Sequence, residues 1–314
     1  MYVDNGAEYY DGGHFQRAYF SWDQALLIDK DNESAMLGQA MALYQMGREE
    51  KLEAIKPLTE ATTRFDALRN KDFDRDQWKV ELGVGLVHQR WCDLYDRKLR
   101  IATEQQKRGV PPDEAQLAIE RSEFTRHLGI AENAFKNVLA GEEKDRHDRL
   151  TCWVGLAQSA LWRDDLPTSL KYANLYLAEI VKSTKLWKDS ATRYPKETPI
   201  WQAKLRGAEM QEADLRDLMG AVYFKMGRTE EAEKELDRII EMFPQHAPAF
   251  LNRGVLRQMR GDDDHAKSDF RKFLSLTALP DSDPSILEST RRLAEVESRL
   301  AAQNARDMQE PPKR

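Results

Sequence analysis

Histidine, cysteine and acidic side chains at fixed spacings do most of the chemistry in proteins, and this chain offers few such arrangements. No histidine falls in the HExxH spacing or in another pair placed with a carboxylate to hold zinc. The histidines are His14, His88, His127, His147, His246 and His265. His88 stands among apolar positions of an expected helix, which favours a buried or groove-facing histidine over a metal ligand. With no nucleophile elbow and no phosphate-binding loop, we expect a non-enzymatic protein with no catalytic residue, no metal and no cofactor.

Two short segments are similar to ligand-binding loops but fit helices better. GDDDHA (261–266) lacks the acid spacing of a calcium loop and falls where a helix is expected to begin. Acids at a helix start are favoured by the helix dipole. GVGLV (83–87) has two glycines, but it lacks the third glycine and the preceding strand of a dinucleotide-binding loop. We expect both segments to be structural.

The two cysteines, Cys92 and Cys152, each stand beside a tryptophan inside a helix-like run. Two cysteines cannot define a disulfide framework in a chain of 314 residues, and no CxxC or Cys/His cluster suggests zinc. We expect buried free thiols, which leave the redox compartment open.

The composition excludes two classes of partner. Hydrophobic residues make up 41% of the chain and charged residues 32%, with a formal net charge of −6. Acids and bases are mixed along the chain, without the basic stripe that neutralises nucleic-acid phosphates. No stretch approaches the roughly 20 apolar residues of a membrane-spanning helix. We expect no nucleic acid partner and no direct membrane insertion.

The elements that would position a site follow an internal repeat. Gly13 and Gly47 lie 34 residues apart, and so do Gly227 and Gly261. After most of these glycines a small residue is followed by a large apolar one: Ala18, Trp22 and Ala25; Ala232, Leu236 and Ile239; Ala266, Phe270 and Phe273. After Gly47 the matching places hold Leu52, Lys56 and Thr59. Small residues let crossing helices approach, the large residue fills the gap between repeats, and glycine ends a helix in a left-handed conformation.

This pattern resembles the tetratricopeptide repeat, a helix–turn–helix unit of 34 residues. The resemblance covers 1–64 and 213–279 as two pairs of repeats, and 74–140 and 147–212 as degenerate repeats with overlong helices. It implies an all-α fold, an α-solenoid in which antiparallel helix pairs form a right-handed superhelix with two long-helix insertions. Residues 283–308 read as an amphipathic helix that caps the last hydrophobic face.

The two degenerate repeats predict helical arms. Within 74–140, one long helix is expected to end at Gly109 and a return helix to begin with Pro111 and Pro112 at its start. Within 147–212, a second extension joins two repeats. Because one insertion lengthens a turn inside a repeat and the other a turn between repeats, we expect the arms to point in opposite directions.

The resemblance implies that a peptide or protein segment binds the concave face lined by the first helix of each repeat. The repeat alignment places the following residues on that face: Tyr10, Leu37, Met41 and Tyr44; Gln158, Leu161 and Trp162; Asp217, Phe224, Lys225, Leu251 and Gln258. One subclass of the family clamps C-terminal carboxylates with Lys, Asn and Arg. Here those places hold Val3, Ala7, Leu37, Gly38 and Met41, so this clamp is not supported.

Two functions from different classes remain open. The first is a scaffold or adaptor that binds a protein partner in the groove. The second is a structural protein that self-associates through its arms or its first repeat, as a homo-oligomer.

Met1 falls inside the first expected helix, which indicates either a chain trimmed of a signal or lipoprotein leader or a short native start. The chain as it stands would be cytoplasmic, and with such a leader it would be periplasmic or a lipoprotein.

Overall fold

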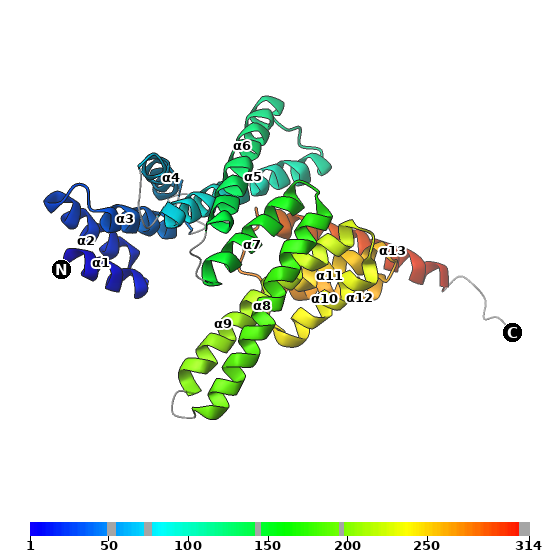
Figure 1. The fold of residues 1–314 in the computed structure, drawn as a ribbon. Coiled ribbons are helices and arrows are strands. Elements are labelled where there is room, and N and C mark those ends of the chain that lie inside the picture. Colours follow the sequence, from blue (N-terminus) through cyan, green and yellow to red (C-terminus); the bar gives the residue numbers. More distant parts are fainter. Residues whose placement is uncertain (49–54, 72–76, 142–145, 195–197, 308–314) are drawn as a thin grey trace. The chain divides into compact units, whose positions relative to one another are not determined.

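The computed structural model describes residues 1–48, 55–71, 77–141, 146–194 and 198–307. Over these ranges the chain is all-α, without a strand, which confirms the predicted fold class (Figure 1). The helices are α1 (Tyr2–Asp11), α2 (Phe15–Ile28), α3 (Glu33–Met46), α4 (Ile55–Arg69), α5 (Gln77–Lys107), α6 (Glu114–Ala140), α7 (Arg146–Trp162), α8 (Leu166–Arg193), α9 (Thr198–Lys225), α10 (Thr229–Met242), α11 (Ala247–Met259), α12 (Asp263–Leu276) and α13 (Pro284–Asp307). Two compact units are described separately: residues 1–99 with 113–159, and residues 100–112 with 160–314.

Trp22 of α2 explains the small residues of the first unit. α2 packs against both α1 and α3. A Cβ atom added at Gly6 of α1 or at Gly38 of α3 would lie 2.5 or 2.4 Å from the Trp22 indole. The ring is 5% exposed, and its Nε1 donates a hydrogen bond to the carbonyl of Val3 at 3.2 Å. Trp22, the large residue four places after Ala18, therefore fills the space between α1 and α3.

The second repeat departs from the 34-residue register. α4 extends beyond residue 64, and it buries Leu58, Ala61, Phe65 and Leu68. Lys56 and Thr59, which the register places in the core, are exposed, and Leu52 lies outside the described residues. The register is wrong here because an ammonium and a hydroxyl cannot fill an apolar gap. Ala61 and Phe65 restore the small–large pair, 43 residues after Ala18 and Trp22.

The two glycines of GVGLV allow α5 to pack closely against α4 and α6. A Cβ atom at Gly83 would lie 2.1 Å from the ring of Phe65 in α4, and one at Gly85 would lie 2.5 Å from the ring of Phe135 in α6. Gly155 of α7 touches the same Phe135 ring, where a Cβ atom would lie at 2.2 Å. Both rings are fully buried. The segment thus has the structural role expected from the sequence.

Left-handed residues end the first helix of most repeats. Gly13, Gly227 and Gly261 have φ angles of +74°, +74° and +80°, and Asp164 takes the equivalent place with φ +61°. Gly47 is the exception, because its φ is −75°. A Cβ atom there would lie 2.9 Å from Cβ of Leu58, so this glycine is needed for the close approach of α3 and α4 rather than for its left-handed freedom.

In the second unit, α9 to α13 pack in sequence order and α13 covers the end of the stack. Val296 of α13 is fully buried against Phe250, Phe270 and Phe273. Ile286, Leu293 and Leu300, which the sequence places on its apolar face, pack against the same cluster. The capping helix is confirmed.

The end of the first predicted arm is not free. In the second unit, Glu104 near the end of α5 is 5% exposed and accepts a hydrogen bond from Nε of Arg291 in α13 at 3.1 Å. Arg108 donates to the carbonyl of Leu287 at 3.1 Å. The second arm, the far ends of α8 and α9, extends away from α10–α13 (Figure 1). The opposite directions of the two arms stay a prediction.

Candidate functional site

Three candidate residues of the first unit, Leu37, Met41 and Tyr44, lie on one face of α3, and Tyr10 lies on α1. The side chain of Asn32 caps this helix by accepting a hydrogen bond from the N–H of Ala35 at 3.0 Å. Leu37, Met41 and Tyr44 follow one another at intervals of four and three residues, which places them in one row along the helix, and Arg48 comes two residues after the helix ends at Met46. Two hollows open along this row.

The first, the Leu37 hollow, has a volume of about 240 Å³. Its lining consists of Tyr10 of α1, Trp22 of α2, Ser34, Leu37, Gly38 and Met41 of α3, and Lys79 of α5. Tyr10 accepts a hydrogen bond from Nε2 of Gln45 at 2.9 Å, and its ring lies 5.9 Å from that of Trp22. The structure thus brings together three residues that the sequence predicted: Tyr10, Leu37 and Met41. Small-molecule pockets usually exceed about 300 Å³, so this hollow suits a single apolar side chain.

The second, the Arg90 hollow, has a volume of about 290 Å³. It is lined by Tyr44, Arg48, Leu86, Gln89, Arg90 and Asp93. Nη2 of Arg90 donates to the carbonyl of Arg48 at 3.2 Å, and its Nη1 lies 4.0 Å from Oδ2 of Asp93. The Asp93 side chain is 46% exposed, and desolvation of its carboxyl raises the pKa of Asp93 to about 6, against the opposing charge of Arg90. Burial also raises the pKa of Tyr44, which is 9% exposed.

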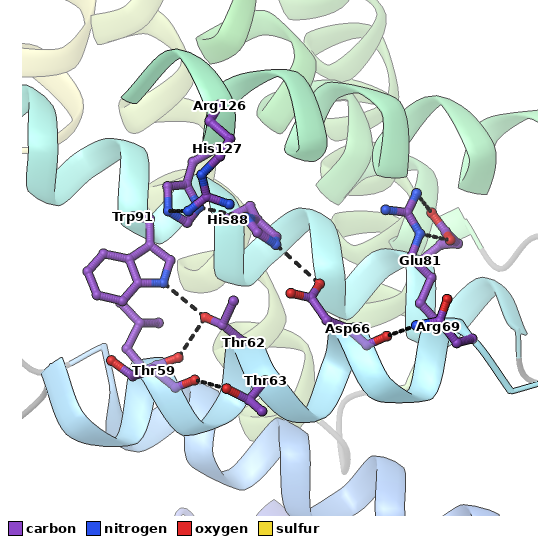
Figure 2. A network of polar contacts seen from close by, with 12 residues as sticks. Thr59, Thr62, Thr63, Asp66, Arg69, Glu81, His88, Trp91, Arg126 and His127 are labelled. Atoms are coloured by element: carbon purple, nitrogen blue, oxygen red, sulfur yellow. Dashed lines mark hydrogen bonds and ion pairs between the residues drawn. The ribbon is translucent and has the colours of Figure 1, made fainter. Parts of the chain in front are cut away.

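A buried histidine pair joins α5 to α6. Figure 2 shows His88 and His127 facing each other, with Nδ1 atoms 2.6 Å apart. Nη2 of Arg126 lies 2.9 Å from Nε2 of His127, and a guanidinium only donates, so this nitrogen accepts. We infer from these roles that neutral His127 donates through Nδ1 to His88. His88 then carries its proton on Nε2, 3.5 Å from Oδ1 of Asp66 in α4.

Both histidines are shielded from water in this arrangement. They are 0% and 3% exposed, and the Trp91 ring stacks on His127 at 5.5 Å. Burial, followed by the charges of His88 and Arg126, lowers the pKa of His127 to about 4. Nε2 of His88 has no hydrogen-bond partner of normal geometry in the described part of the chain. The interpretation of His88 as a buried histidine is confirmed.

Further polar contacts fix α5 against its neighbours. Nε1 of Trp91 donates to the Thr62 hydroxyl of α4 at 2.9 Å. Arg69 of α4 binds both carboxylate oxygens of Glu81 at 2.7 and 3.0 Å, and Asn137 of α6 donates to Glu81 at 3.1 Å (Figure 2 shows Arg69 and Glu81). α5 contributes Lys79 to the Leu37 hollow, and Gln89, Arg90 and Asp93 to the Arg90 hollow. The contacts above therefore hold the α5 side of both hollows in position.

The other predicted groove residues are dispersed. Gln158 belongs to the first unit, whereas Leu161 and Trp162 belong to the second, and all three are half-buried. Asp217 accepts a hydrogen bond from Asn252 at 2.7 Å, and burial raises its pKa. Lys225 pairs with Asp164 at 2.8 Å. As candidate binding residues, these five stay a prediction.

Three C-terminal candidates have contacts of their own within the second unit. Phe224 packs against the cluster of Ala232, Leu236 and Ile239. Leu251 is 6% exposed and lies in the core beside Phe250. Gln258 accepts from Arg292 at 2.8 Å and donates to Glu295 at 3.3 Å, both on α13. As groove residues, Phe224, Leu251 and Gln258 stay a prediction, because the repeat alignment cannot show which side chains the neighbouring helix covers.

Sequence reasoning missed most of the Arg90 hollow. Arg48 comes four residues after Tyr44, so its spacing was a usable signal. Gln89, Arg90 and Asp93 lie more than 40 residues further along the chain than Tyr44, and no motif links them to it. Their grouping follows only from the packing of α5.

No described side chains suggest a metal site or a membrane span. Groups of three or more His, Cys, Asp or Glu residues that could hold an ion do not occur among the described residues. Within the same ranges, no helix is both long enough and apolar enough to cross a bilayer. Cys92 and Cys152 are both buried, and neither forms a disulfide, as expected.

Comparison with known proteins adds one family match. A family model described as tetratricopeptide repeat matches residues 216–246, which comprise the end of α9 and α10. No curated protein matches the chain.

Among solved structures, the chain is similar to a tetratricopeptide repeat protein from Parabacteroides merdae, with 15% identity, a TM-score of 0.41, and coverage of 94% of this chain and 97% of that one. It is also similar to a chain of the APC/C hetero-tetramer Cut9–Hcn1, with 12% identity and a TM-score of 0.40, over 90% of this chain. It spans only 52% of that second protein's length.

Proposed function

We propose that this tetratricopeptide-repeat protein is a non-enzymatic scaffold that binds a segment of a protein partner at the Leu37 hollow. The observation that carries the proposal is the grouping of Tyr10, Leu37 and Met41, from two helices, around one cavity of about 240 Å³. The family commonly serves as a platform for protein–protein contacts. The chemistry of the hollow supports a partner that inserts one apolar side chain.

The walls of the Leu37 hollow are held in place before any partner arrives. Trp22 is fixed by its hydrogen bond to Val3 and by the backbones of Gly6 and Gly38. Tyr10 is fixed by Gln45. Rigid aromatic walls lose little conformational entropy on binding, and buried aromatic contacts dominate interface energies. The hollow therefore has the properties of an anchor site for a protein segment.

Met41→Glu is expected to reduce partner recovery at least tenfold, because it places an unpaired carboxylate against the inserted apolar side chain, which costs several kcal/mol. Met259→Glu is the matched control, since Met259 is 64% exposed on α11. The measurement is affinity capture from a lysate of the source organism, quantified by mass spectrometry, with circular dichroism to verify folding. Equal recovery with the wild type and Met41→Glu, or an equal loss with the control, would contradict the proposal.

A second candidate function is self-assembly through the α8–α9 arm. Four large apolar side chains of this region are exposed: Leu186 at 57%, Tyr194 at 50%, Ile200 at 56% and Met210 at 62%. Exposed apolar surface of this kind often marks an interaction site. Light scattering distinguishes the two functions. A dimer that disappears in Leu186→Lys with Ile200→Lys favours self-assembly, and a monomer at micromolar concentration favours the scaffold.

A further inference from the structure

We infer that the Arg90 hollow is an oxyanion subsite, which takes a carboxylate or phosphoryl group of the same partner segment whose apolar side chain occupies the Leu37 hollow. The link between the two hollows rests on the proposed function. The anion site itself rests on the charges and contacts described below, and it is tested separately.

The cations of the Arg90 hollow outnumber its acids. Arg48 and Arg90 contribute two guanidinium groups to the lining, and Asp93 contributes one carboxyl. Arg90 is 19% exposed, and its Nε has no hydrogen-bond partner among the described residues. Its Nη1 lies 4.0 Å from the carboxylate of Asp93, beyond the distance of a normal hydrogen bond. Arg48 already donates through Nη1 to Oε1 of Gln45 at 3.2 Å, and Arg90 through Nη2 to the carbonyl of Arg48, so a bound oxyanion would add acceptors for the remaining N–H groups of the two arginines. Arginine favours carboxylate and phosphate oxygens.

Asp93 makes the subsite sensitive to pH. The charged groups around it are Arg90 and Asp96 on α5, and Arg48 lies across the hollow beside Tyr44. Its pKa of about 6 means that Asp93 is ionised at pH 7.5 and repels an incoming anion. At pH 5 most Asp93 carboxyls are protonated, so the repulsion of the anion is weaker. Anion binding should therefore strengthen as the pH falls through 6.

The spacing of the two hollows defines the partner segment. Leu37 precedes Tyr44 by seven residues of α3, which is about 10 Å along the helix, and Met41 precedes Arg48, just beyond the end of the helix, by the same number of residues. An extended peptide covers about 10 Å with three residues. The row of side chains on α3 is continuous between the hollows. The fitting segment thus carries an apolar residue and an acidic or phosphorylated residue about three positions apart.

Sulfate is the probe for the anion site, because it stays a dianion between pH 5 and 7.5 whereas phosphate titrates. The measurement is the ¹H–¹⁵N signal of Arg90 Nε–H in the full chain, assigned by its loss in Arg90→Met. We expect a saturable shift with sulfate, with an affinity about tenfold higher at pH 5 than at pH 7.5. In the Asp93→Asn variant, the affinity for sulfate should be as high as that of the wild type at pH 5, and it should not change with pH. Titrations with acetate and with phosphoserine then separate a carboxylate from a phosphoryl ligand, according to which binds more tightly.

A shift of the Arg90 signal that never saturates with sulfate would overturn the inference. An equal shift of the Nε–H signal of Arg238, an arginine on α10 that is 55% exposed, would also overturn it. An unchanged pH dependence in Asp93→Asn would also overturn it. Capture with Arg90→Met tests the link to the partner, with Arg238→Met as the matched control. If Met41→Glu abolishes capture and Arg90→Met does not, the proposed function stands and the linked subsite fails. If the sulfate results hold and Met41→Glu leaves capture unchanged, the anion site stands and the proposed function fails.

Discussion

Phe135→Ala is expected to destabilise the first unit by about 3–5 kcal/mol, the range for removing a fully buried phenylalanine. The ring is 0% exposed and fills the space left by Gly85 of α5 and Gly155 of α7. Its loss would leave a cavity among three helices. The free energy of unfolding in urea, followed by circular dichroism, measures the effect. Phe20→Ala is the control, because Phe20 is 56% exposed and its removal should cost less than about 0.5 kcal/mol.

Gly155→Ala provides a sharper test of the same contact, because its effect should change sign. In the wild type, the added Cβ would lie 2.2 Å from the Phe135 ring, so the substitution should be destabilising. In the Phe135→Ala background the obstacle is gone, and alanine should stabilise α7 by up to about 1 kcal/mol over glycine. Equal destabilisation in both backgrounds would show that the Phe135 ring is not what requires glycine at this position.

Acid is expected to weaken the first unit through His127. The pKa of this buried imidazole falls from 6.5 to about 4 on folding. A lowered histidine pKa contributes stability that is fully present above pH 6.5 and is lost as the pH falls toward 4. The loss is on the order of 3 kcal/mol, because each pKa unit corresponds to about 1.4 kcal/mol. Protonation of His127 would turn a ring nitrogen that now accepts a hydrogen bond into an N–H donor, and this N–H would face another donor, either on Arg126 or on the imidazole of His88.

His127→Gln isolates this contribution, since glutamine does not titrate. The expected result is a smaller decrease in urea midpoint between pH 7.5 and pH 4 than in the wild type. The difference between the two proteins is the relevant quantity, because Asp93, whose pKa is raised to about 6, acts in the opposite direction. His14→Gln, at an exposed position, should keep the wild-type pH dependence. Parallel curves for the wild type and His127→Gln would rule out His127 as the acid-sensitive group.

The sequence predicts the fold well wherever the small–large pattern is intact. Trp22, Leu236 and Phe270 each lie against a glycine of a preceding helix, at Gly6, Gly220 and Gly254. The pattern fails in the second repeat because Ala61 follows Ala18 by 43 residues and not by 34. A fixed register cannot detect the longer connection, whereas the apolar spacing of Leu58, Ala61, Phe65 and Leu68 can.

The candidate site is only partly predictable, for a related reason. Tyr10, Leu37 and Met41 follow from repeat position, because the first helices of successive repeats lie side by side. Arg90 and Asp93 depend on the rotation of α5 about its own axis, which the Gly83 and Gly85 contacts determine. Gln258 was predicted as a groove residue, but it hydrogen-bonds α13, a helix outside the repeat pattern.

Photo-crosslinking from Ser34 tests the central claim most directly. Ser34 is exposed and lines the Leu37 hollow, so a benzoylphenylalanine at this position reaches whatever occupies it. Ser275 is the matched control, because it is exposed on α12 in the second unit. The account predicts that the captured partner crosslinks from position 34, through a segment that contains an apolar residue, and not from position 275. A partner that is captured but crosslinks only from position 275, or equally from both, would contradict binding at the Leu37 hollow.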